Sequence, residues 1–276
     1  LELLAEVLLQ PTFPAAELER RREAVLAGMR AAEDNPGLLG YRAFLGLVYG
    51  GEPYGHLTEG TPEAVRAITR DDVRAFYARH YGPGRAIVTV VGDIGADEAV
   101  ALLNGALAGW KAGTAAAPFT YPEEADAAPA VRVIRKPLSQ TNIVLGHRGI
   151  ARDAPDYYAV EVMNYILGGG GFGSRLLDRV RTEHGLAYSV SSGFATPKFP
   201  GSFRVAMQTK RESTREALRL TCAELLRIRS EPVDDDELEG AKLYLTGNFP
   251  LQLDSNRKIA AFLGSIEFFG LGDDYA

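Results

Sequence analysis

The sequence has a single cysteine, Cys222, and no long hydrophobic run. One cysteine cannot close a disulfide within the chain, and it cannot supply the thiolates of a structural zinc site. A membrane-spanning helix needs about 18 or more consecutive apolar residues, and polar side chains interrupt every apolar stretch before that length. The sequence therefore argues against a disulfide framework, a thiolate metal site and a membrane span.

The chain also lacks a long run of basic residues. Its net charge is -6, and the short run Arg20-Arg21-Arg22 is flanked by Glu19 and Glu23, which is typical of a solvated helix face. Proteins that bind nucleic acid cluster lysine and arginine against the phosphates. We therefore expect no nucleic-acid partner.

The length and the hydrophobic pattern predict an α+β protein in two halves. With 276 residues, of which 46% are hydrophobic, the chain can bury a sizeable core. In the first half the pattern predicts helices over residues 1–9, 15–33, 37–48, 62–68, 70–80 and 96–110, and a buried strand over 86–91. A segment rich in Ala, Pro and Glu, residues 112–130, is typical of a linker. The second half is predicted to form strands over 131–135, 142–147, 187–195 and 202–209, with helices over 156–167, 175–184, 212–229, 234–246 and 256–269.

The most informative segment is a run of four glycines. These are Gly168, Gly169, Gly170 and Gly171. Such a run in a helix or strand carries a large entropic cost, so it predicts a loop in which backbone conformation or close approach matters. Ser174 is the expected N-cap of the helix that follows, and Gly185 is expected to end that helix before the strand over 187–195.

Arg181 and Tyr188 flank this helix-to-strand corner. A guanidinium group and a phenol that lie near one another can both donate to a peptide carbonyl or to an oxyanion. Ordinary structural roles are the alternative: Arg181 paired with a surface acid, Tyr188 half-buried in its strand, and the glycines forming only a flexible turn.

Together with the segment 156–167, these residues resemble the second domain of the insulinase/pitrilysin-type zinc peptidases, the inverzincins. The resemblance is greatest to the bacterial branch that is similar to the mitochondrial processing peptidase. Five short motifs in the first half are similar to the first domain of that family: Pro11-Thr12-Phe13-Pro14, Glu33-Asp34-Asn35-Pro36, Gly60-Thr61-Pro62-Glu63, Phe76-Tyr77-Ala78-Arg79-His80-Tyr81-Gly82-Pro83 and Val90-Val91-Gly92-Asp93.

The resemblance implies two homologous-type domains, each a mixed sheet with helices packed on one face. Residues 1–111 would be the C-terminal part of the first domain, 112–130 the linker and 131–276 the second domain. Leu1 is not a start methionine and residues 1–9 already follow a helical pattern. We therefore expect a fragment whose upstream part is missing, and whose end stops before the last helix and strand of the second domain.

The zinc ligands of the active relatives are missing from this chain. The inverted motif H-x-x-E-H is absent, and the four histidines are scattered singly: His56, His80, His147 and His184. By the resemblance, the third zinc ligand falls at Gly28 and a second family glutamate falls at Arg21, two helical turns earlier. Neither residue can bind zinc, so no metal site is expected in this chain.

The resemblance implies a noncatalytic, substrate-binding subunit of a heterodimeric zinc peptidase. Arg181 and Tyr188 would contact the peptide near the scissile carbonyl, and the glycines at 168–171 would lie along its path. A separate chain of the family would supply zinc and the general base, so no peptidase activity is expected from this chain alone. Bacterial relatives of the paired type are often exported, which favours the periplasm over the cytoplasm.

Two other functions stay open. The first is a single-chain zinc peptidase whose H-x-x-E-H motif lies upstream and which recruits an unusual third ligand. The second is a noncatalytic scaffold or binding subunit, like the relatives that are core subunits of respiratory complexes.

Overall fold

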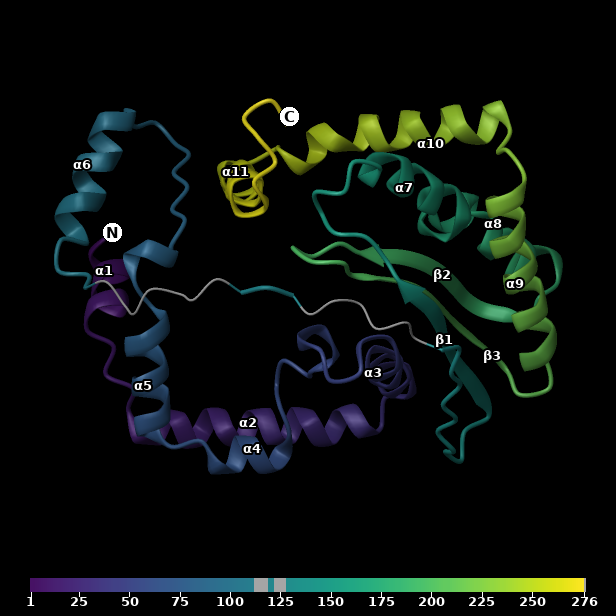
Figure 1. The fold of residues 1–276 in the computed structure, drawn as a ribbon, viewed down its shortest axis with the longest axis horizontal. Helices are drawn as coiled ribbons and strands as arrows, with labels where there is room; N and C mark the ends of the chain where they lie inside the picture. Colours follow the sequence, from purple (N-terminus) through teal and green to yellow (C-terminus); the bar gives the residue numbers. More distant parts are fainter. Residues whose placement is uncertain (112–118, 122–127, 276) are drawn as a thin grey trace. The chain divides into compact units, whose positions relative to one another are not determined.

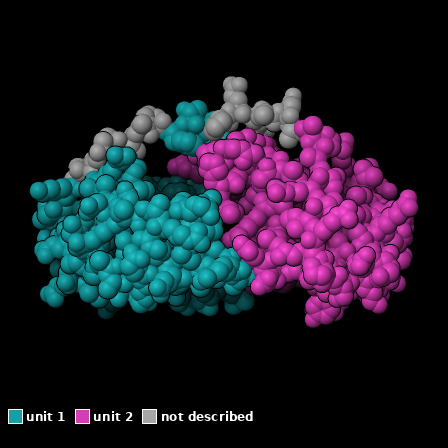
Figure 2. All heavy atoms as spheres, turned by 90° about the horizontal axis from the view of Figure 1, so that it is seen from below, with its two compact units in different colours: residues 1–31, 58–121, 251–276 teal, residues 32–57, 122–250 magenta. Residues whose placement is uncertain are grey.

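The computed structural model describes residues 1–111, 119–121 and 128–275, and its contacts group them into two compact units. Unit 1 comprises residues 1–31, 58–121 and 251–276, and unit 2 comprises residues 32–57 and 122–250 (Figure 2). The predicted linker falls largely outside the described residues. The boundaries of the two peptidase-like domains therefore stay a prediction.

Unit 1 is built from helices. Its helices are α1 (Glu2–Leu9), most of α2 (Ala15–Glu33), α4 (Pro62–Ala67), α5 (Arg70–His80), α6 (Ala96–Ala106) and α11 (Asn256–Phe269), with a 3-10 turn at Pro83–Arg85. Side-chain caps set several of their first turns, as the capping box between Thr69 and Asp72 does for α5. The helices predicted from the sequence are confirmed, with ends that shift by up to four residues.

Two arginines of unit 1 tie its helices together through backbone carbonyls. Arg70, at the start of α5, donates to the carbonyl of Phe13 at 2.7 Å and to that of Thr12 at 2.8 Å. Arg22 of α2 donates to the carbonyl of Ile68, which follows α4, at 2.6 Å. These bonds fix the loop before α2 and the end of α4.

The strands predicted over residues 86–91 and 131–135 are wrong for this structure. Ile87, Val88 and Val90 are each nearly half exposed, and Val131 is 91% exposed. Their β-branched side chains favour an extended chain. A strand also needs a neighbour to pair its backbone, and no other described segment pairs with either stretch.

Unit 2 contains an antiparallel sheet with the order β1-β3-β2. Its strands are β1 (Gln140–Arg148), β2 (Ala187–Ala195) and β3 (Ser202–Lys210), which confirms three predicted strands. Met207 of β3 lies opposite Ile143 of β1 and Val190 of β2. The α+β class is confirmed. Within the described part of the chain the sheet is wholly antiparallel rather than mixed.

The helices of unit 2 come from both halves of the sequence. They are α3 (Pro36–Tyr49), α7 (Tyr157–Asn164) with a π-helical turn at Tyr165–Gly169, α8 (Arg175–Leu177) with a π-helical turn at Asp178–Glu183, α9 (Thr214–Ser230) and α10 (Asp235–Asn248). Three 3-10 turns lie at Pro53–Gly55, Gly171–Gly173 and Phe249–Gln252. No helix in residues 1–111, 119–121 or 128–275 has the length and apolar character of a membrane span.

The core of unit 2 lies between one face of the sheet and the helices of the second half. Val205 of β3 packs there with Leu176 of α8 and Leu220 of α9, and all three are fully buried. Burying a side chain of this size stabilises the fold by about 1.5–3 kcal/mol. Figure 1 shows α7, α8 and α10 along the same side of the sheet.

Helix α3 covers the opposite face of the sheet at β1. A Cβ atom added to Gly40 would lie 3.3 Å from Cγ2 of Val144, and the Arg204 guanidinium lies 4.6 Å from the ring centroid of Tyr41. Val144 and Arg204 alternate with the core residues along their strands, so they face away from the core. Helices therefore cover both faces of the sheet at β1, whereas the prediction was that helices pack on one face only.

Candidate functional site

The glycine run divides into a buried part and an exposed part. Gly168 and Gly169 belong to the π-helical turn that extends α7, although the sequence predicted a loop for the whole run. Gly168 is buried against β2. A Cβ atom at this position would lie 2.5 Å from Oγ and 2.6 Å from the backbone nitrogen of Ser192. The missing side chain at Gly168 thus lets the helical turn approach the strand.

The chain changes direction at Gly170 and Gly171. The Gly170 N–H donates to the carbonyl of Tyr165 at 2.8 Å, and a Cβ at Gly170 would lie 2.7 Å from that same oxygen. Gly171 has φ +61°, a left-handed conformation that favours glycine. It is exposed, and a Cβ there would meet nothing within 4 Å.

Ser174 closes the 3-10 turn that follows. It occupies the predicted N-cap position of α8, but its hydroxyl donates to the carbonyl of Gly171 at 2.7 Å instead of capping the helix. Its backbone N–H donates to the same carbonyl at 3.1 Å. Ser174 is fully buried, so these two bonds hold the turn Gly171–Gly173 from below.

Arg175 anchors the end of this turn to α10. Its Nε donates to Oε1 of Glu237 at 2.7 Å, and its Nη2 donates to the other carboxylate oxygen. The Arg175 side chain is only 9% exposed. Hydrogen bonding by Arg175 holds the pKa of Glu237 below its usual range. Glu237 also forms the capping box of α10 with Asp234, so one carboxylate serves both contacts.

The corner between α8 and β2 has the predicted glycine stop. Gly185 has φ +62°, and its N–H donates to the carbonyl of Arg181 at 2.8 Å. The N–H of Leu186 donates to the carbonyl of Val180 at 2.9 Å. The bond from Gly185 to Arg181 is the one that defines the αL motif, and the bond from Leu186 joins residues six apart after a π-helical turn. Together with the left-handed glycine, they end the helical segment and direct the chain into the strand.

A β-bulge directs Tyr188 outward. Ala187 lies opposite Thr209 and Ser189 lies opposite Gln208, so Tyr188 is an extra residue in the ladder. Continuing the alternation of Val190 and the other core residues of β2 would place residue 188 on the core face. The bulge instead leaves Tyr188 75% exposed while Ala187 stays buried.

Arg181 lies close to two exposed aromatic rings. Its guanidinium carbon is 5.8 Å from the ring centroid of Tyr188 and 5.4 Å from that of Phe172. Both distances suit cation–π contacts. Phe172 comes from the glycine turn and is 82% exposed. Phe172 was not among the predicted site residues, although an aromatic residue between two glycines is a signal that the sequence contains.

Within the part of the chain that the structure describes, the hydrogen-bond donors of this cluster have no protein partner. Among the described residues, neither the Arg181 guanidinium nor the Tyr188 hydroxyl makes a hydrogen bond or an ion pair. The structural alternatives, an arginine paired with a surface acid and a half-buried tyrosine, therefore do not describe these side chains. The structure brings Arg181 and Tyr188 together as predicted, and their role in binding or catalysis stays a prediction.

The positions expected to bind zinc in active relatives lie on α2. Arg21 and Gly28 are both exposed, and a Cβ at Gly28 would meet nothing within 4 Å. Across residues 1–111, 119–121 and 128–275, no three His, Cys, Asp or Glu side chains are grouped so that they could hold a metal ion.

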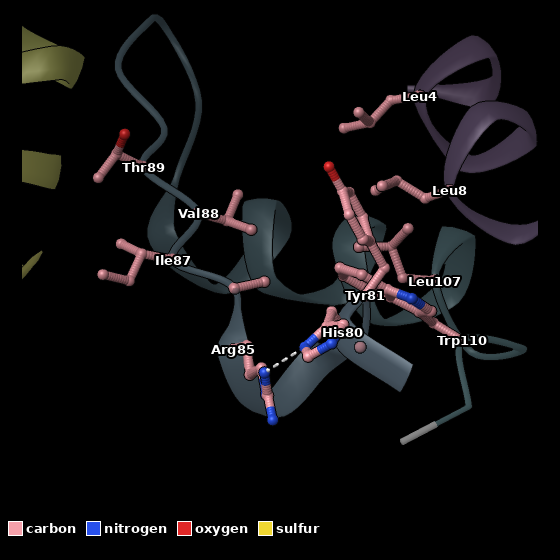
Figure 3. Close-up of a pocket in the computed structure, with 12 residues that line it drawn as sticks. Leu4, Leu8, His80, Tyr81, Arg85, Ile87, Val88, Thr89, Leu107 and Trp110 are labelled. Atoms are coloured by element: carbon pink, nitrogen blue, oxygen red, sulfur yellow. Dashed lines mark hydrogen bonds between the residues drawn. The ribbon is translucent and has the colours of Figure 1, made fainter. Parts of the chain in front are cut away.

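Unit 1 also contains an apolar cavity of about 570 Å³ (Figure 3). Leucines from α1, residues 86–89 and Trp110 line it. Its histidine, His80, accepts a hydrogen bond at Nδ1 from Nη1 of Arg85 at 3.1 Å. The cavity includes none of the predicted site residues, all of which belong to unit 2. The candidate site is therefore an exposed surface and not this cavity.

The chain is similar to proteins of known sequence or structure. A peptidase M16 inactive domain from Pseudomonas fluorescens is 35% identical with a TM-score of 0.91, and the match covers 98% of this chain and 64% of that one. An uncharacterized zinc protease of Streptomyces coelicolor is 28% identical over 97% of this chain and 59% of its own length. A non-peptidase homolog of Helicobacter pylori is 28% identical over 98% of this chain and 61% of its own length.

The chain thus spans about three fifths of the length of these curated relatives. The family model described as the peptidase M16 inactive domain matches residues 67–245, well over half of the chain. This match includes the whole glycine run, Arg181 and Tyr188. The sequence match and the fold agree with the resemblance to the insulinase/pitrilysin type, and the chain belongs to the peptidase M16 inactive-domain family.

Proposed function

We propose that this chain is the noncatalytic, substrate-binding subunit of a heterodimeric M16 zinc peptidase. A separate chain of the same family would carry the zinc and the general base. The observation that supports this proposal best is the pairing of Arg181 with Tyr188, two neighbouring side chains whose donors are free among the described residues. The same chain has Arg21 and Gly28 where the family resemblance places carboxylates.

The geometry of β2 suits an extended peptide. In the order β1-β3-β2 the strand pairs only with β3 among the described strands, so it is an edge of this sheet. A peptide can add to such an edge through main-chain hydrogen bonds. Tyr188 stands at the beginning of this edge and Arg181 is beside it. A peptide laid along β2 would therefore pass both donors.

The two donors match the charge that develops during peptide hydrolysis. Attack on the carbonyl carbon places negative charge on its oxygen, and the charged guanidinium can stabilise that oxyanion. The Tyr188 hydroxyl can donate a second hydrogen bond to the same oxygen or to a neighbouring carbonyl. The activation of water belongs in this proposal to the partner chain, with its zinc and general base.

The names of the relatives keep two other functions open. The chain matches 59% of a relative named as a zinc protease, so the unmatched part of such a protein could carry the metal motif of a single-chain peptidase. Another relative is named a non-peptidase homolog, which favours a scaffold or binding role. These two functions and the heterodimer predict different zinc contents for this protein and different peptidase activities when it is mixed with other members of the family.

The test is to purify the product of the whole open reading frame and to measure its zinc content and its peptidase activity. Activity is measured alone and after mixing with family members that copurify with it. We expect little zinc in this protein, and activity only in the mixture. About one zinc per chain with activity alone would establish the single-chain peptidase. Copurification without activity in any mixture would establish the scaffold.

A further inference from the structure

Phe172 is more exposed than Tyr188, and both of its neighbours in sequence are glycines, which have no side chain. It is 82% exposed and lies between Gly171 and Gly173. A Cβ atom added to either glycine would meet nothing within 4 Å. Open space therefore adjoins the backbone on both sides of the ring, and another molecule can approach it there.

The turn that carries this ring is held in place. The buried hydroxyl of Ser174 donates to the Gly171 carbonyl, and the N–H of Gly173 donates to the Gly170 carbonyl at 3.4 Å. The next residue, Arg175, is fixed to Glu237 by two hydrogen bonds. Because the anchored turn keeps the Phe172 ring in water, the fold does not gain the free energy of burying this ring. A ligand that covers the ring gains that free energy when it binds.

The ring also lies beside the donors of the proposed site. The Arg181 guanidinium carbon is 5.4 Å from the Phe172 centroid and 5.8 Å from the Tyr188 centroid. A peptide carbonyl that accepts a hydrogen bond from this guanidinium is therefore within a residue or two of the Phe172 ring. An apolar side chain on such a residue can reach the ring.

We propose that Phe172 is a specificity-determining residue, whose ring binds an aromatic or large aliphatic side chain next to the carbonyl held by Arg181 and Tyr188. This inference rests on the proposed peptide-binding function. The substrate class is then extended peptides with a large apolar residue next to the bound carbonyl. Aromatic pairs favour edge-to-face or offset contacts beyond simple burial, so phenylalanine is preferred to leucine and leucine to glutamine.

The experiment measures peptide binding to the chain by fluorescence anisotropy. The probes are labelled, unstructured Ala/Ser/Thr peptides that differ at one guest position, which carries phenylalanine, leucine, alanine or glutamine. The proteins are the unaltered chain, Phe172→Ala, Phe172→Leu and Arg181→Ala. Phe76→Ala is the matched control, since Phe76 is an exposed aromatic residue of α5 in unit 1. Because Phe172 and Phe76 are both largely exposed, neither substitution removes core packing.

The expected result is that the phenylalanine peptide binds about 3- to 10-fold more tightly than the glutamine peptide. Phe172→Ala abolishes that preference, Phe172→Leu keeps part of it, and Phe76→Ala leaves it unchanged. Arg181→Ala weakens every peptide by a similar factor. Binding that depends on Arg181 but shows the same guest preference in Phe172→Ala would overturn this inference and leave the proposed function standing. The absence of any binding that depends on Arg181 would overturn both.

Discussion

Arg175 and Glu237 form a two-bond ion pair that joins the end of the glycine turn to the first turn of α10. The pair is largely enclosed on the arginine side, where the side chain is 9% exposed. Because hydrogen bonds to charged groups strengthen when water is excluded, this contact is an anchor for the turn that presents Phe172.

We predict that Arg175→Ala lowers the free energy of opening of unit 2 by about 1.5–3 kcal/mol, the range for hydrogen bonds to charged groups. The measurement is native-state hydrogen exchange at the amides of β2 and α10. Arg219→Ala is the matched control, because that arginine forms an exposed ion pair with Glu216 and is expected to contribute about 0–1 kcal/mol. Equal effects of the two variants would refute the anchoring role of Arg175.

The same ion pair predicts a pH dependence. The pKa of Glu237 is lowered in the folded protein, first by the hydrogen bonds from Arg175. A carboxyl with a lowered folded pKa adds stability above its unfolded pKa of about 4.3, and this stability is lost as the pH falls through the lower folded value. Stability measured from neutral pH downward should therefore fall in this acid range, and less steeply in Glu237→Gln. Parallel curves for the two proteins would contradict the prediction.

Gly168→Ala is predicted to destabilise unit 2 by about 1–3 kcal/mol, because the new methyl group collides with Ser192 of β2. Gly28→Ala is the control. Gly28 lies on α2 with open space around it, and alanine there should stabilise the helix by about 0.5–1 kcal/mol. Urea unfolding of both variants gives the comparison, and a neutral Gly168→Ala would show that the helical turn moves away from β2 at no cost.

Substitutions at the donor pair test the proposed role in hydrolysis. In the assembled complex we predict that Arg181→Ala lowers kcat by about 100- to 1000-fold, as the loss of one oxyanion donor does. Tyr188→Phe, which removes one neutral hydrogen bond, should lower kcat about tenfold. Assembly is measured in parallel by sedimentation, with the exposed arginine of α9 changed in Arg215→Ala as the control. Unchanged kcat in both site variants would refute the assignment.

The sequence predicted the elements whose signals are local. The helix predicted over residues 70–80 is α5, whose first turn is set by two residues close in sequence, Thr69 and Asp72. Gly185 ends the helical segment before β2 as predicted, because glycine enters the left-handed region without strain. The predicted end of the helix and start of the strand placed Arg181 and Tyr188 at one corner, and the fold brings them together.

The rest depends on contacts between distant segments. The bulge at Tyr188 is defined by its pairing with β3, and the contact of Gly168 with Ser192 depends on how closely a helical turn approaches a strand. Neither leaves a periodic signal. For the segments 86–91 and 131–135 the local signal was present but misleading. Their composition favours a strand, but no described segment pairs with them.

The division of the glycine run has a consequence for how such chains diverge. Gly168 is required by the packing of the fold, whereas the Phe172 ring is 82% exposed and contributes nothing to the buried core. In a descendant that has lost the peptide-binding role, selection on the fold would still preserve the first glycine, while drift would be free to replace Phe172. A relative that keeps only the glycine therefore shows a shared fold, whereas a relative that also keeps the aromatic residue shows a retained binding role.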